Sequence, residues 1–145
     1  VGHRCQASSM KVVHEGTAMK ILSGIPVLQC RDIDNTLTFY LDYLRFVTVK
    51  RRESEQGLQW VHIMHGDTTL MLQRIDSEQA ERSGNGNIDM YFFVDDIDEF
   101  HHFLQSRGYP VSDVFQTPYR IREFSLIDPE GNSLTLGKVL VSSGL

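Results

Sequence analysis

The chain repeats itself at an offset of 64 residues, and this repeat constrains the fold more than any other feature. Asp32-Ile33-Asp34 recurs as Asp96-Ile97-Asp98, and Thr69-Leu70-Met71-Leu72 aligns with Ser133-Leu134-Thr135-Leu136. The remaining matches are Phe39 with Phe103 and Ile63 with Ile127. Because similar segments at a constant spacing indicate similar structural units, the 145 residues predict one domain built from two related modules.

The first module has the pattern of a strand, a helix and three further strands. Residues 25–30 form a short apolar run typical of a strand. Asp34 is expected to start the helix, because its carboxylate can accept hydrogen bonds from the free N–H groups of the first turn. The predicted buried helix face carries Leu37, Tyr40, Leu41 and Leu44. Further strands are predicted at 46–51, 59–64 and 69–73, with Gly66-Asp67 as the last hairpin turn.

The second module has the same order of elements. A strand is predicted at 90–94, and Asp96 or Asp98 is expected to cap the helix that follows, which ends at Gly108. Its buried face is predicted to carry Ile97, Phe100 and Leu104. The remaining strands are predicted at 111–115, 123–127 and 133–136, with residues 128–132 forming the last turn.

Together these patterns predict an α+β fold made of two βαβββ modules. The expected divisions are an N-terminal extension at 1–18, a first module at 19–76, a linker at 77–86, a second module at 87–138 and a tail at 139–145.

Composition excludes several classes of function. The net charge of −5 argues against nucleic acid as a partner, since phosphate binding needs a basic surface. No apolar run is long enough to span a membrane. Cys5 and Cys30 match no disulfide framework or zinc spacing, which fits a reducing cytoplasmic location.

Three segments carry a resemblance to a known superfamily. They are residues 25–32, Phe39-Tyr40, and Arg122 to Asn132 with its Asp-Pro-Glu-Gly-Asn turn. The chain resembles the vicinal oxygen chelate superfamily of glyoxalases, extradiol dioxygenases and bleomycin-resistance proteins, and most closely the last group, over about residues 20–138. The resemblance implies curled mixed sheets that form a cup. It also implies a homodimer whose ligand grooves lie where the subunits meet, and which sequesters a drug without changing it.

The same resemblance supplies a test for metal binding. The four positions at which the superfamily places His, Gln or Glu ligands correspond to Ile25, Met71, Asp89 and Thr135. Hard divalent ions need oxygen or imidazole donors, and a catalytic metal needs about three protein ligands. Only Asp89 is a plausible ligand, so we expect no metal and no other cofactor.

His62 is a separate candidate. If Gly66-Asp67 is a two-residue turn, His62 lies opposite Met71 and enters the cup, where it could join Asp89. The repeat instead aligns His62 with Leu126, which points the other way. We prefer the turn argument, because the two hairpins have different loops. A His-Asp pair could bind metal weakly or act as an acid–base couple, and a lone His could hydrogen-bond a ligand or pack.

Strand alternation predicts the lining of the cup, because residues two apart on a strand share a face. The predicted ligand-binding residues are Gln29, Trp60, His62, Met71, Asp89, Tyr91, Phe93, Glu123, Ser125 and Thr135. Aromatic surfaces beside carboxylates favour a planar or cationic guest.

The sequence therefore predicts a non-enzymatic protein that sequesters a small aromatic or cationic compound, including an antibiotic of the bleomycin type. The alternative is a divergent metal-dependent lyase, isomerase or dioxygenase, which would need His62, Asp89 and Glu123 to converge. A third interpretation is a dimer with a filled cup that acts through protein contacts.

Overall fold

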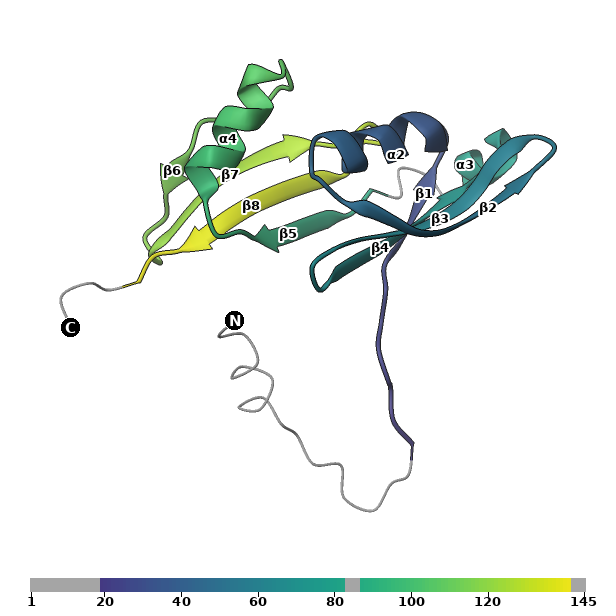
Figure 1. Cartoon of the computed structure of the whole chain (residues 1–145), viewed down its shortest axis with the longest axis horizontal. Coiled ribbons are helices and arrows are strands. Elements are labelled where there is room, and N and C mark those ends of the chain that lie inside the picture. The colour runs from purple at the N-terminus through teal and green to yellow at the C-terminus, as the bar shows by residue number, and fades with distance from the viewer. Residues whose placement is uncertain (1–18, 83–86, 142–145) are drawn as a thin grey trace.

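The computed structural model describes residues 19–82 and 87–141, which form two four-stranded sheets with a helix packed on each (Figure 1). The elements in chain order are β1 (Val27–Cys30), α2 (Ile33–Asp42), β2 (Val47–Ser54), β3 (Gly57–His65), β4 (Thr68–Arg74), α3 (Ser77–Arg82), β5 (Asp89–Phe93), α4 (Ile97–Ser106), β6 (Phe115–Gln116), β7 (Ile121–Ile127) and β8 (Ser133–Val139). The predicted extension at 1–18 lies outside the described residues. The predicted linker contains the short helix α3.

The two sheets have the same topology, as the repeat predicts. Their strand orders are β1-β4-β3-β2 and β5-β8-β7-β6. In each sheet the first and last strands of the module pair in parallel, and the other neighbours are antiparallel. No strand of one sheet pairs with a strand of the other within the described residues. The prediction of an α+β fold with two βαβββ modules is confirmed.

One hydrophobic core joins the two modules on the helix side of the sheets. It combines buried residues of α2 and its sheet, such as Phe39 and Ile63, with Leu104, Phe124 and Leu136 of the second module. In Figure 1, α2 lies near the middle of the molecule, between the two sheets. The Phe39 ring packs against the Tyr109 ring at a centroid distance of 4.9 Å, which brings α2 onto the second module.

The capping residues of the two helices contradict one prediction and resolve another. The N-cap of α2 is Asp32, whose carboxylate accepts from the backbone N–H of Asn35, whereas Asp34 lies in the first turn. The prediction of Asp34 as the cap was therefore wrong by two residues. In α4 the cap is Asp96, and it accepts from Glu99 N–H. Both helices begin with the same local contact, because both follow the same Asp-Ile-Asp pattern.

The strand register decides between the two placements of His62. Met64 pairs with Thr69, and His62 therefore pairs with Met71, as the two-residue turn predicts. In the second sheet Ile127 pairs with Ser133, so β3 and β7 correspond at an offset of 63, while β4 and β8 correspond at 64. The alignment of Ile63 with Ile127 was thus wrong by one residue, because the second hairpin has a longer turn.

The strand predicted at 111–115 is reduced to a two-residue β6. Pro110 has no N–H group to donate before it. The N–H of Ser125 on β7 is bound by the Ser112 side-chain oxygen and not by a backbone carbonyl. A side chain therefore replaces part of the strand ladder, and regular pairing begins only at Phe115, which faces Glu123.

The turn between β7 and β8 holds α2 against the second module through hydrogen bonds. Tyr40 donates its hydroxyl to the Asp128 carboxylate at 2.6 Å, and both residues are buried. Glu130 accepts hydrogen bonds from the backbone N–H of Asp32 and from the hydroxyl of Thr36. These contacts join residues almost a hundred positions apart, so the Asp-Pro-Glu-Gly-Asn turn has a structural role in this chain.

Alkaline conditions should test the hydrogen bond between Tyr40 and Asp128. Burial first, and then the neighbouring Asp128 carboxylate, raise the pKa of Tyr40 well above its ordinary value. The unfolded chain releases this proton above about pH 10 while the folded chain keeps it, so stability is complete below pH 10 and falls as pH rises. The expected slope from Tyr40 is about 1.4 kcal/mol per pH unit. Urea unfolding between pH 9 and 11 should show the wild-type and Tyr40→Phe stabilities converging as pH rises. Parallel curves would contradict this expectation.

Candidate functional site

Each sheet has one face that no helix covers, and we call these two surfaces the open faces. The open face of module 1 consists of Val27, Gln29, Trp60, His62, Met64, Thr69, Met71 and Gln73. The open face of module 2 consists of Asp89, Tyr91, Phe93, Glu123, Ser125, Ile127, Ser133, Thr135 and Gly137. Alternation along each strand places these residues opposite the buried core residues. The ten predicted site residues therefore all lie on open faces.

Module 1 presents a half-buried surface with basic residues at its edge. His62 lies between Met71 on β4 and Lys50 on β2. In the next row Trp60 lies between Gln73 and Arg52, and the Arg52 guanidinium sits 5.4 Å from the Trp60 ring centroid. Such a cation–π contact holds the indole in place and occupies one of its faces. A ligand could therefore stack only on the other face of Trp60.

Module 2 presents an aromatic and acidic surface. Tyr91 donates its hydroxyl to the Glu123 carboxylate at 2.6 Å, and its ring packs beside Phe93 at 5.0 Å. Tyr91 reaches Glu123 by lying across Gly137, where any Cβ atom would collide with the Tyr91 hydroxyl. Burial, followed by the hydrogen bond to Glu123, raises the pKa of Tyr91 to about 12, so the phenol stays a donor at neutral pH. This pair fixes one Glu123 oxygen.

His62 has an unsatisfied polar atom. Its Nε2 is buried and has no hydrogen-bond partner among the described residues. Because a buried polar atom without a partner is costly, this nitrogen calls for a bound water, a ligand or a group from another chain. Its neighbour Met71 offers only a thioether, a weak acceptor.

Within one chain the predicted site residues form two groups and do not make a single cup. Gln29, Trp60, His62 and Met71 lie on the first sheet, and the other six lie on the second. In the part of the chain that the structure describes, no three His, Cys, Asp or Glu side chains lie together as metal ligands. The enzyme alternative requires His62, Asp89 and Glu123 to converge, and within a single chain they do not.

The side chains at the four positions that the resemblance assigns to metal ligands do not offer the donors of a catalytic ion. Met71 and Thr135 are on the open faces, on β4 and β8, and Asp89 begins β5. A thioether and an aliphatic side chain, here Met71 and Ile25, give no hard donors, and a neutral hydroxyl is a weak one. One carboxylate is left, which is too few ligands for a catalytic site.

Sequence reasoning missed three residues that shape these faces. Lys50 and Arg52 were not predicted, because two register shifts in the β2–β3 pair make it unreliable to assign strand partners by counting residues. Gly137 was not predicted, because a glycine in a strand has several explanations. Its place two residues after Thr135 could nevertheless have assigned it to the predicted face.

Two further features bear on the kind of protein. Cys30 is a free thiol buried in the core, and burial together with the nearby carboxylates of Glu130 and Asp128 raises its pKa to about 12, so it is a poor nucleophile. Among the described helices, none combines the length and the apolar character that crossing a membrane requires.

Comparison with known proteins identifies relatives of this architecture. A family model described as "Glyoxalase/Bleomycin resistance protein/Dioxygenase superfamily" matches residues 23–136. A search of curated proteins gave no match.

Three solved structures illustrate the range of proteins with this fold. A bleomycin-binding protein complexed with bleomycin has a TM-score of 0.59 and 23% identity, covering 80% of this chain and 97% of that chain. TnmS3, an antibiotic binding protein from Streptomyces sp. CB03234, has a TM-score of 0.63 and 20% identity, covering 83% and 99%. A lactoylglutathione lyase from Agrobacterium tumefaciens has a TM-score of 0.64 and 23% identity, covering 82% and 95%. At these identities the likeness concerns the fold, which binding proteins and enzymes share.

Proposed function

Because the chain belongs to the Glyoxalase/Bleomycin resistance protein/Dioxygenase superfamily and carries Ile25, Met71 and Thr135 at three of the superfamily's four metal positions, we propose that it is a non-enzymatic binding protein. Its ligand is a small aromatic or cationic compound, and an antibiotic of the bleomycin type is the first candidate. The observation that carries the proposal is this donor-poor set of positions beside the aromatic and acidic open face of module 2. It needs no cofactor, and its place is the cytoplasm, where Cys30 stays reduced.

The proposed binding unit is a homodimer in which the module 1 open face of one chain meets the module 2 open face of its partner. Phe93 is 70% exposed and Tyr91 is 41% exposed in the single chain, although both are large aromatic residues. Lys50 and Arg52 border one open face, and Asp89 and Glu123 lie on the other, so the two surfaces have complementary charges. Together they would enclose a groove with aromatic walls.

Glu123 has a defined role in this proposal. Tyr91 holds one of its carboxylate oxygens, and the other remains available to a cationic group on the ligand. Trp60 and Phe93 supply flat surfaces for stacking. The polar edge therefore orients the guest, and the aromatic surfaces supply most of the contact area.

A titration of the purified protein with metal-free bleomycin, monitored by the fluorescence of Trp60, the single tryptophan, tests the proposal. We expect saturable quenching at one or two sites per dimer, recovery of chemically unchanged drug, and dimers by light scattering. A panel of cationic and anionic aromatic compounds should show a preference for the cations. Absence of any saturable response over the whole panel would remove the proposal.

A charge variant should weaken binding selectively. We expect Glu123→Gln to reduce the affinity for a cationic ligand about tenfold, because it removes the charge that faces the guest. Glu55→Gln is the matched control, since Glu55 is exposed in the β2–β3 turn and belongs to neither open face. The measurement is the dissociation constant from Trp60 fluorescence. Equal losses of affinity in both variants would show that only the overall electrostatic field of the protein matters.

The second candidate function is a metal-dependent lyase, isomerase or dioxygenase, and the unsatisfied Nε2 of His62 is the observation that favours it. In the proposed dimer His62 of one chain would approach Asp89 and Glu123 of the other. Elemental analysis of the purified protein discriminates between the two functions. A stoichiometric divalent ion that is lost in His62→Ala, together with turnover of a superfamily substrate, would establish the enzyme.

A further inference from the structure

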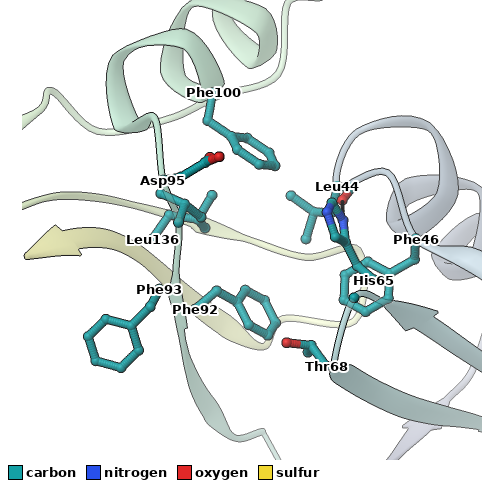
Figure 2. Close-up of a pocket in the computed structure, with 11 residues that line it drawn as sticks. Leu44, Phe46, His65, Thr68, Phe92, Phe93, Asp95, Phe100 and Leu136 are labelled. Carbon is teal, nitrogen blue, oxygen red and sulfur yellow. Dashed lines mark hydrogen bonds between the residues drawn. The ribbon is translucent and has the colours of Figure 1, made fainter. Parts of the chain in front are cut away.

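A pocket between the two modules lies on the helix side of the sheets, away from the open faces. Its volume is about 480 Å³, within the range of small-molecule sites. Figure 2 shows Phe92 and Phe100 extending from the second module toward Leu44 and Phe46 of the first. Phe93, the neighbour of Phe92 on β5, also borders the pocket, but its ring points away from this space toward the open face. Strand β5 therefore separates the pocket from the module 2 open face.

The base of the pocket is aromatic and well packed. Phe46 is buried, and its ring contacts the Phe92 ring at a centroid distance of 6.2 Å and the His65 ring at 5.8 Å. The contacts come from both modules, so the shape of the pocket is set by the joint between them. Flat apolar walls of this kind suit one aromatic ring of a guest.

The polar groups of the pocket include acceptors on His65 and Asp95. His65 contacts the Leu44 carbonyl through Nδ1 at 3.0 Å, and because a carbonyl only accepts, Nδ1 is the donor there. In the tautomer that donates from Nδ1, Nε2 is the acceptor. The Asp95 carboxylate points into the same space, and Thr68 adds a hydroxyl (Figure 2). No ion pair among the described residues engages Asp95.

The first turn of α4, next to Asp95, is acidic, whereas Arg45 and Arg107 place their guanidinium groups over the Phe103 ring further along the helix. A bare helix N-terminus would attract anions, but α4 begins with Asp96 as its cap and with Asp98 and Glu99 in its first turn. Arg122 is already paired with Asp98 at 2.8 Å. Lys138 shares a neighbouring depression with Asp95 but forms no ion pair with it among the described contacts.

From this geometry we infer that the pocket between the modules is a second ligand site, for small aromatic ammonium compounds, and is independent of the open faces. The ring occupies the space between Phe46, Phe92 and Phe100. The ammonium group donates to Asp95, with His65 Nε2 as a further acceptor. Anionic aromatic compounds are excluded by the Asp95 charge.

The probe for this site is 2-phenylethylammonium, compared with the neutral 2-phenylethanol and the anionic 3-phenylpropionate. Titrations of isotope-labelled protein are followed by NMR, using the signals of His65, Thr68 and the Phe92 ring. For a ligand of this size we expect a dissociation constant on the order of 1 mM for the ammonium compound. The neutral compound should bind at least about fivefold more weakly, and the anion should not bind.

Two variants locate the binding. We expect Asp95→Asn to weaken ammonium binding about fivefold and to leave phenylethanol binding unchanged, whereas Glu55→Gln in the remote hairpin turn should change neither. Thr68→Phe, which adds a ring on the pocket side of β4, should block all binding. The fluorescence of Trp60 should stay constant throughout, because Trp60 lies on the opposite face of β3 from His65.

Several results would overturn the inference. One is the absence of shifts at His65 and Thr68 up to about 20 mM ammonium compound, a concentration well above the expected dissociation constant. Another is equal binding of the ammonium compound and the alcohol, or an unaltered affinity in Asp95→Asn, which would mean that Lys138 already neutralises the carboxylate. A change in Trp60 fluorescence without NMR shifts at His65 would show that the ligand binds on the module 1 open face. Failure of bleomycin binding would not affect this site.

Discussion

Asp128→Ala is expected to lower the free energy of unfolding by about 3–5 kcal/mol. Asp128 is 3% exposed, and its carboxylate accepts four hydrogen bonds, from Tyr40, from the backbone N–H groups of Glu130 and Asn132, and from the Asn132 side chain. Alanine would leave these donors unsatisfied, and the buried hydroxyl of Tyr40 and N–H of Asn132 would also be kept from water.

Urea unfolding followed by circular dichroism measures this loss. Asp128→Asn should cost less, about 2 kcal/mol, because an amide keeps one acceptor oxygen but presents an N–H group to donors on its other side. Asp113→Ala is the control, since Asp113 is exposed in the loop before β6. A loss below about 1 kcal/mol for Asp128→Ala would mean that the turn is not the main joint between the modules.

Phe93→Asp is expected to abolish drug binding and dimer formation together, with affinities reduced by about a hundredfold or more. Phe93 is the most exposed aromatic residue on the module 2 open face, and its row of the sheet includes Gly137 and Glu123. In the proposed dimer a carboxylate here would be buried beside the carboxylate of Glu123. Two like charges taken out of water together are strongly unfavourable.

Light scattering and Trp60 fluorescence report the two losses, and far-ultraviolet circular dichroism verifies the fold. The single chain should fold normally, because the Phe93 side chain faces solvent on the open face. Tyr119→Asp is the matched control, as Tyr119 is 82% exposed and lies between β6 and β7. Normal dimers that bind the drug as tightly as wild type would place the ligand groove elsewhere.

Local sequence patterns account for most of the fold. Helical and strand periodicity, together with the repeat, predicted both modules and nearly every element. The errors have local physical causes. Asp32 and Asp34 are both acceptable capping residues two positions apart, and only the surrounding chain selects Asp32. The strand at 111–115 has a β-type pattern, but the Ser112 side chain takes the place of the backbone carbonyl as acceptor for Ser125 N–H, and only the bond from Ser112 N–H to the Ser125 carbonyl remains.

The candidate site was predictable by face but not by contact. Alternation placed all ten predicted residues on the open faces, since the period of a strand is fixed by its backbone. The interactions of those residues depend on register. The register shift between Arg52 and Glu53 in the β2–β3 pair brings Arg52 beside Trp60, and the close approach over Gly137 brings Tyr91 to Glu123. No spacing rule predicts either contact.

The sequence by itself determined the two modules and their elements, because these follow from residue type and period. The poor set of donors at the metal positions followed from the resemblance to the superfamily. Only the tertiary structure decided how the modules meet. The contact of Tyr40 with Asp128 and the pocket between Phe46 and Phe92 each join residues from different modules. Such contacts arise when two separately patterned surfaces pack into one core, and their geometry is a property of the packing rather than of either segment.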